Sequence, residues 1–210
     1  MSGYLPLCAL RQDLLPSACR SCAWWLTSGP GPAGREEGHA RRREWMLANE
    51  TVWGATGLID PATILPNGEA SLDRGGSIQF APTSVLPRLR NLPLGPLPAD
   101  SAVIFCLCIQ NESDKALARR LLQKSLGELK ARKIKEVYAF ASLHGGAQGG
   151  DECEFFDPGL LQRVGFVPIR DNGQLFLMKV DLRGLSTILT QIQTRFRRAL
   201  HHQPACSPTA

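Results

Sequence analysis

The sequence lacks any long apolar run, and this absence excludes an ordinary membrane-spanning helix. A span needs roughly 20 consecutive apolar residues, and the main apolar stretch, AVIFCLCIQ at 102–110, is far shorter. The N-terminus starts with apolar residues, but it has no basic segment ahead of them and no clean cleavage site. We therefore expect no signal peptide and a cytoplasmic protein.

A dense basic patch is also missing, although the chain has 24 Lys and Arg against 19 Asp and Glu, a net charge of +5. Much of this charge sits at 41–43 and 195–198, where solvated helix faces are the ordinary explanation. Nucleic-acid-binding surfaces usually interleave a denser basic patch with aromatics. The charge thus argues against a nucleic-acid binder and is compatible with a small anionic ligand.

The seven cysteines do not form the even set of a secreted disulfide framework, and two of them lie inside the apolar run 102–110. Cys19 and Cys22 have the spacing of half a zinc site. No second pair follows at close spacing, and Cys8 and His39 are the conceivable partners. Three interpretations stay open: packing under the two tryptophans that follow, a metal site, or a redox pair. We rank packing first and expect no zinc.

The order of the predicted elements favours one α/β (α+β) domain with a mixed sheet. Turn residues and hydrophobic periodicity predict helices at 35–50, 114–132 and 158–164, and strands around 53–59, 75–81, 102–110, 136–141, 166–170 and 174–181. The sequence Asp171-Asn172-Gly173 is a strong hairpin signal between the last two strands. The proline-dense segment 82–98 predicts an irregular surface loop.

This order, together with particular residues, resembles the GNAT superfamily of N-acetyltransferases. The segment LLQRVGFVPIRDNGQLFLMKVDL at 160–182 is similar to the closing unit of that family, in which a short helix ends in Gly-Phe before a hairpin. GGSIQFAP at 75–82 looks like its third strand, and 102–110 and 136–141 look like its fourth and fifth. The segments CRSCAWW at 19–25 and 80–88 resemble a bacterial subgroup with a Cys-x-x-Cys-x-Trp arm.

The resemblance implies the GNAT fold: a mixed, mostly antiparallel sheet that is splayed between its fourth and fifth strands and flanked by helices. It implies acetyl-CoA or another acyl-CoA as substrate, with an amine as acceptor. The positions that would hold the acyl-CoA are those on the fourth strand and the following helix turn: Cys108, Ile109, Gln110, Lys115, Ala116, Leu117, Ala118 and Arg119. Backbone N–H groups near Cys108–Gln110 would polarise the thioester carbonyl during direct attack by the amine.

The turn at 113–118 departs from the family pattern, Arg/Gln-x-x-Gly-x-Gly/Ala. Ser113 replaces the basic residue, and Ala116 replaces the first glycine, which allows close approach of backbone to phosphate. Glu112 and Asp114 would also repel a pyrophosphate, and their carboxylates would interact with the positive end of the helix dipole that the pyrophosphate would otherwise use. Lys115 and the arginines that follow could partly offset this repulsion.

The family often uses a carboxylate as base and a tyrosine in the short helix as acid, but no tyrosine lies in that helix here. Cys153 is a candidate general acid, because thiols titrate near ~8.5, and the alternative is a small buried hydrophobe. Glu152 is a candidate base in an acidic cluster that could equally be a solvated loop. Tyr138 is a weaker candidate, because a position inside a strand favours a core role.

Two hypotheses follow. The first is an acyl-CoA-dependent N-acyltransferase that acts on an amine of a small molecule or protein; the second is a catalytically inactive GNAT-fold binding or assembly module. We expect an arm at 1–34, the acyltransferase-like domain at 35–182, an amphipathic helix at 183–202 that could pack across a homodimer, and a disordered tail at 203–210.

Overall fold

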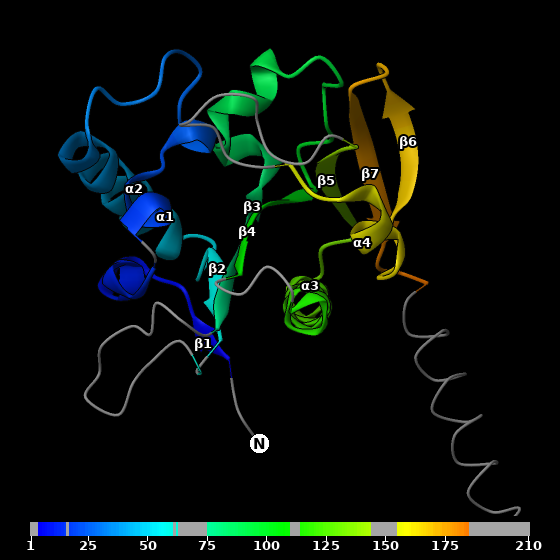
Figure 1. Cartoon of the computed structure of the whole chain (residues 1–210), viewed down its shortest axis with the longest axis horizontal. Helices are drawn as coiled ribbons and strands as arrows, with labels where there is room; N and C mark the ends of the chain where they lie inside the picture. The colour runs from blue at the N-terminus through cyan, green and yellow to red at the C-terminus, as the bar shows by residue number, and fades with distance from the viewer. Residues whose placement is uncertain are drawn as a thin grey trace, which may run out of the picture.

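The fold is built on one seven-stranded sheet with the strand order β1-β2-β3-β4-β5-β7-β6 (Figure 1). The computed structural model describes residues 4–15, 17–60, 62, 75–109, 114–143 and 155–184. The strands are β1 (Leu5–Pro6), β2 (Gly57–Ile59), β3 (Gly76–Pro82), β4 (Ala102–Ile109), β5 (Glu136–Ser142), β6 (Val167–Asp171) and β7 (Leu175–Asp181). All neighbouring strands are antiparallel except β4 and β5, which confirms the predicted mixed, mostly antiparallel sheet.

Helices flank this sheet. They are α1 (Ser17–Ser21), α2 (Arg35–Glu50), α3 (Lys115–Ala131) and α4 (Pro158–Gln162), with 3-10 helices η1 (Ala9–Leu14), η2 (Trp24–Leu26), η4 (Thr83–Val85) and η5 (Pro87–Asn91). The predicted bounds of α2 are confirmed, and those of α3 and α4 differ by at most two residues. No helix of the described residues is long and apolar enough to cross a membrane.

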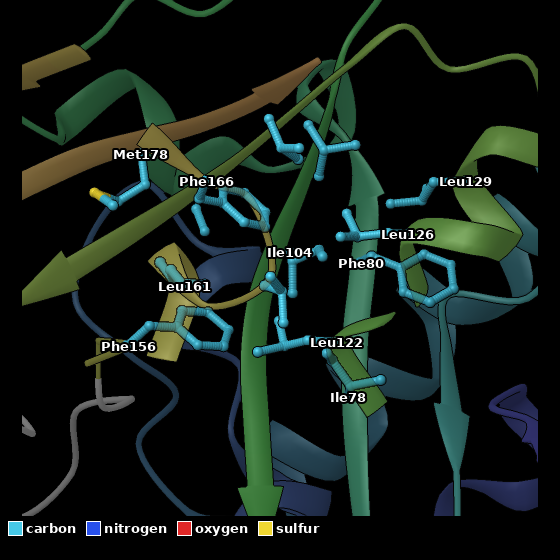
Figure 2. Close-up of a cluster of buried hydrophobic side chains, with 14 of the residues drawn as sticks. Ile78, Phe80, Ile104, Leu122, Leu126, Leu129, Phe156, Leu161, Phe166 and Met178 are labelled. Atoms are coloured by element: carbon cyan, nitrogen blue, oxygen red, sulfur yellow. The ribbon is translucent and has the colours of Figure 1, made fainter. Parts of the chain in front are cut away.

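The α3 side of the sheet carries the main hydrophobic core. Ile78 and Phe80 of β3 and Ile104 of β4 face Leu122, Leu126 and Leu129 of α3, while Leu161 of α4 and Phe166 extend the cluster (Figure 2). The side chains that α3 turns toward the sheet recur at helical spacing, and Leu117, Leu121, Ser125, Leu126 and Leu129 are all buried. Each fully buried leucine contributes about 1.5–3 kcal/mol, so this face fixes α3 against the sheet.

The opposite face of the sheet is covered by the N-terminal arm and is not exposed to solvent. Trp25 of η2 is 3% exposed, and its ring lies 5.7 Å from that of Phe105 and 5.9 Å from that of Phe140. Arg88 stacks on Trp24 at 4.5 Å and donates to the Trp24 carbonyl at 3.0 Å. The arm is therefore a packed layer of the domain.

The prediction of an irregular loop at 82–98 is wrong in part. Proline at the first position of η5 is compatible with a 3-10 turn, and Leu86, Leu89 and Leu94 are buried against the arm. Leucines between the prolines supply the apolar contacts that order this segment. The predicted C-terminal helix, 183–202, and tail, 203–210, lie outside the described residues except for 183–184.

Candidate functional site

Strands β4 and β5 pair over only two positions and then separate. Ala102 is opposite Val137 and Val103 is opposite Tyr138, after which no ladder joins the two strands in the described part of the chain. β4 continues on β3 as far as Ile109. The splay expected between the fourth and fifth strands is thus confirmed.

The two edges of this splay differ. The edge of β5 is taken by the chain itself, because the Phe156 N–H donates to the Phe140 carbonyl and the Ser142 N–H donates to the Phe156 carbonyl, both at 3.0 Å. The facing edge of β4 instead lines an open groove. A ligand with an extended amide chain would therefore find its strand partner in β4 alone.

The groove has a volume of about 1660 Å³ and runs from the end of β4 to the N-terminus of α3 and the start of α4. The arm forms its opposite wall. Its lining includes Cys19, Cys22, Gly29–Arg35, Arg88, Cys106–Ile109, Asp114, Lys115, Ala118 and Phe155–Asp157, with Gly159, Leu160 and Arg163 of α4. It is bordered by elements from several parts of the chain, as ligand sites commonly are.

The N-terminus of α3 is closed by its own cap. Asp114 accepts a hydrogen bond from the Leu117 N–H at 2.8 Å, so one of the amides that an anion would use is already occupied. Among the described residues, the Lys115 and Ala116 N–H groups of this turn have no hydrogen-bond acceptor. The cap therefore lowers the capacity of the helix end for a pyrophosphate, and its carboxylate adds a repulsive charge.

The charges along the groove favour an anion overall. Four basic side chains line it, those of Arg35, Arg88, Lys115 and Arg163, against two carboxylates, Asp114 and Asp157. Asp157 is held as the cap of α4 by the Leu160 N–H at 2.6 Å. Arg163 lies 3.8 Å from this carboxylate. Sequence reasoning missed Arg163 and Arg35, since only the folding of α4 and the arm around the groove brings them to α3.

A second polar group lies at the arm end of the groove. Cys106 and Cys108 are two apart on β4 and share one face, and both hydrogen-bond to Cys19 of α1. Arg42 of α2 adds its positive charge. Together they lower the pKa of Cys19 to about 3, in spite of burial.

The predicted acyl-CoA residues do not all reach the groove. Cys108, Ile109, Lys115 and Ala118 line it, whereas Leu117 is buried in the main core at 4% exposure. Two further positions, Ala116 and Arg119, are exposed on α3 outside the groove lining. Gln110 and the catalytic candidates Glu152 and Cys153 lie outside the described residues.

Tyr138 is part of the buried cluster under the arm and does not line the groove. Its hydroxyl donates to Glu136 at 2.7 Å. Burial, together with this hydrogen bond and the carboxylate charge, raises the pKa of Tyr138 to about 12. The hydroxyl is therefore committed to Glu136, and its catalytic role stays a prediction.

Cys19 packs against the hydrophobic cluster formed by Leu7, Met46 and Ile59, and both Cys19 and Cys22 line the groove together with Trp24. Packing under the two tryptophans stays a prediction. Neither Cys8 nor His39 completes a metal site with the two cysteines: within the described ranges, no three His, Cys, Asp or Glu side chains are arranged to hold a metal ion. His39 instead contacts Asp13 at 3.3 Å.

Comparison with known proteins assigns this architecture to a known fold. No family model matches the sequence, and no curated protein matches it. Among solved structures, a ribosomal-protein-alanine N-acetyltransferase from Brucella melitensis matches with a TM-score of 0.50 and 15% identity over 85% of this chain and 99% of that one. yncA from Salmonella typhimurium, solved with its cofactor acetyl-CoA, matches with a TM-score of 0.50 and 12% identity over 86% and 93%. The chain has the GNAT fold. Identities this low show the fold alone.

Proposed function

We propose that this chain is an acyl-CoA-dependent N-acyltransferase with a weakened pyrophosphate site. The observation that carries the proposal is the groove along the edge of β4, which ends at the N-terminus of α3. General chemistry supports it too: an extended amide chain pairs with a strand edge, and phosphates suit a helix N-terminus. An acyl-CoA brings both parts and an activated acyl group.

In this proposal each wall of the groove has a task. Backbone groups of Cys106–Ile109 pair with the amide arm of the substrate, and the N–H group of Lys115 meets its phosphates. Arg163 and Lys115 supply positive charge. N–H groups near Cys108–Gln110 polarise the thioester carbonyl, and the acceptor amine approaches from the arm side for direct attack.

Proton transfer falls to residues between β5 and α4. We keep Glu152 as the proposed base and Cys153 as the proposed acid, because the chain returns from β5 to Phe155, which lines the groove. An amine must lose a proton on acylation, and the departing thiolate must gain one. Two neighbouring groups, shortly before Phe155 in the sequence, would serve both needs.

The second candidate function, a GNAT-fold module that binds or assembles without catalysis, rests on the α3 cap. The Asp114 carboxylate holds the Leu117 N–H at 2.8 Å, where a pyrophosphate would otherwise bind. If this competition is strong, the groove holds a smaller ligand or none. The segment 183–202, for which the sequence predicts an amphipathic helix, would then be the element for assembly, for instance in a homodimer.

Calorimetric titration with acetyl-CoA separates the two functions. The enzyme proposal expects heat and a rise in the unfolding temperature; neither signal at millimolar acetyl-CoA would refute it and leave the binding module. A parallel titration with desulfo-CoA, which keeps the phosphates and pantetheine, is the control for binding without the thioester. Release of free thiol from acetyl-CoA in the presence of an amine panel then reports transfer.

We further propose membership of the GNAT subgroup with a Cys-x-x-Cys-x-Trp arm, since this arm forms one wall of the groove here. We also propose a cytoplasmic location. The five cysteines in the described part of the chain are free thiols, which is typical of proteins in a reducing compartment. The acceptor is an amine of a small molecule or a protein. A panel of both kinds in the thiol-release assay distinguishes them.

A further inference from the structure

A buried guanidinium without a carboxylate partner lies beneath the arm. Arg42 of α2 is 3% exposed; one terminal nitrogen donates to the Cys22 carbonyl at 2.7 Å and the other to Gln79 Oε1. Its Nε has no partner, and no ion pair in the described ranges includes it. Because a buried cation is costly unless an anion compensates it, this position points to a nearby negative group.

Two further polar side chains on β3 support this conclusion. Gln79 is 1% exposed and Ser77 is 3% exposed, and neither Gln79 Nε2 nor Ser77 Oγ has a hydrogen-bond partner among the residues that the structure describes. In the β3–β4 register Gln79 is opposite Cys106 and Ser77 is opposite Cys108. Directly opposed residues share a sheet face, so these polar atoms lie on the face that carries the two cysteines.

The thiolate of Cys19, which lies on α1 against this sheet face, supplies the negative charge. It receives hydrogen bonds from Cys106 and Cys108, and Arg42 acts on it electrostatically. It also lines the groove, so dissolved reagents reach it. The titratable and charged groups around it from the neighbouring elements are Arg20, Cys22, Arg42, Cys106 and Cys108, with Arg88, Asp114 and Lys115 farther along the groove. The adjacent Arg20 is 3.8 Å from Asp13 of η1.

The environment also selects the chemistry of this thiolate. A strongly stabilised thiolate is a good leaving group and a weak nucleophile. A thioester on Cys19 would therefore return its acyl group to an ordinary thiol, which disfavours an acyl-enzyme. Oxidation differs, because reactive low-pKa thiolates beside a second thiol form sulfenic acids that resolve to disulfides.

We propose that Cys19 is a peroxide-reactive modification site, and that a β4 cysteine, Cys106 or Cys108, resolves it as a disulfide that ties α1 to β4. In the first step the Cys19 thiolate attacks one oxygen of hydrogen peroxide, the O–O bond breaks, and hydroxide leaves. Cys19 becomes a sulfenic acid. In the second step the β4 thiol attacks this sulfur, the S–O bond breaks, and water leaves once the thiol proton has moved to the hydroxyl. The two cysteines together lose two electrons, which the peroxide accepts.

The sequence allows a direct test, because trypsin places Cys19, Cys22 and the two β4 cysteines in three different peptides. Cleavage places Cys19 in peptide 12–20, Cys22 in 21–35, and Cys106 with Cys108 in 91–115. The full chain is treated with one equivalent of hydrogen peroxide, blocked with iodoacetamide, and mapped without reduction. We expect a cross-link between 12–20 and 91–115 that disappears on reduction. A cross-link between 12–20 and 21–35 as the main product would overturn the proposal.

Variants and a rate measurement complete the test. Cys19→Ser should abolish the cross-link, Cys8→Ser should leave it unchanged, and Cys106→Ser and Cys108→Ser identify the resolving thiol.

The alkylation rate of peptide 12–20 in the folded chain should change less than about twofold between pH 5 and pH 8, because the thiolate is already formed throughout. In the urea-unfolded chain the same peptide should react about tenfold faster for each pH unit. A tenfold rise per unit in the folded chain would show an ordinary thiol and refute the proposal, and this readout needs no variant to fold.

Discussion

Gly38 of α2 is the position where one added methyl group should test the packing of the arm most directly. A Cβ built at Gly38 would lie 2.1 Å from the backbone oxygen of Ser21 and 3.1 Å from Pro32 Cγ. Ser21 ends α1 and lines the groove two residues after Cys19. Gly38→Ala therefore forces α1 and α2 apart at the segment that carries the cysteine.

The magnitude follows from two opposing effects. Alanine in a helix interior is favoured over glycine by about 1 kcal/mol. Overpacking a tight contact costs about 1–3 kcal/mol, and more where backbone has to move. Because the obstructing atom is a backbone oxygen that must retreat by about 1.3 Å to reach ordinary contact, we expect a net loss of about 2 kcal/mol in the free energy of unfolding. For a chain of this size that loss lowers the unfolding temperature by about 4–8 °C.

Gly127 of α3 provides the matched control. It is exposed, and a Cβ there meets nothing within 4 Å. Gly127→Ala gains the same helix propensity without the clash, so it should stabilise the chain by about 0.5–1 kcal/mol. Urea unfolding followed by tryptophan fluorescence measures both variants. Equal or greater stability of Gly38→Ala relative to the original chain would refute the described contact between α1 and α2.

Three further predictions concern single side chains. Asp114→Asn keeps a capping oxygen but removes a charge, so if acetyl-CoA binds, its Kd should fall about fivefold, an effect of about 1 kcal/mol in calorimetry. Arg132→Met should lower the free energy of unfolding by about 2 kcal/mol, because Arg132 bonds Glu128 at 2.9 Å and the Trp53 carbonyl at 3.2 Å. Tyr138 should form its phenolate near pH 12 rather than the ordinary 10.0; since its folded pKa is raised, the stability it contributes is fully present below pH 10 and is lost as the pH rises toward 12.

Each of these has its own control. Asp171→Asn removes an exposed charge outside the groove, and an equal gain in affinity there would mean that Asp114 acts only through net charge. Arg41→Met breaks an exposed pair with Glu37 at 2.7 Å and should cost only about 0.3–0.5 kcal/mol; a similar loss for both arginine variants would contradict the anchoring role of Arg132. For the tyrosine, the difference in absorbance between the original chain and Tyr138→Phe isolates its titration, and a midpoint near pH 10 would show that Glu136 does not hold the hydroxyl.

Local signals in the sequence were sufficient for most of the sheet and its helices. The Asp157 cap with Pro158 marks the start of α4, and Asp171-Asn172-Gly173 marks the hairpin, because caps and turns depend on adjacent residues. The apolar stripe of α3 follows from its period alone.

The arm and the cysteine cluster depend on contacts that are distant in sequence. Cys19 meets Cys106 and Cys108 because the arm folds back over β4, and Arg42 meets Gln79 across the same face. No spacing rule relates positions this far apart. The ordered 3-10 turns within 82–98 could not be predicted for a related reason, because their leucines pack against residues of the arm that are distant in sequence.

The unequal edges of the splay have a consequence for amide hydrogen exchange. The Phe156 and Ser142 N–H groups are already bonded across the edge of β5, so they should exchange slowly whether or not a ligand is present. Groove-facing amides of β4 should become slow only when a ligand pairs with them. Exchange protection that appears on one strand and leaves the other unchanged would thus reveal an extended occupant before its chemical identity is known.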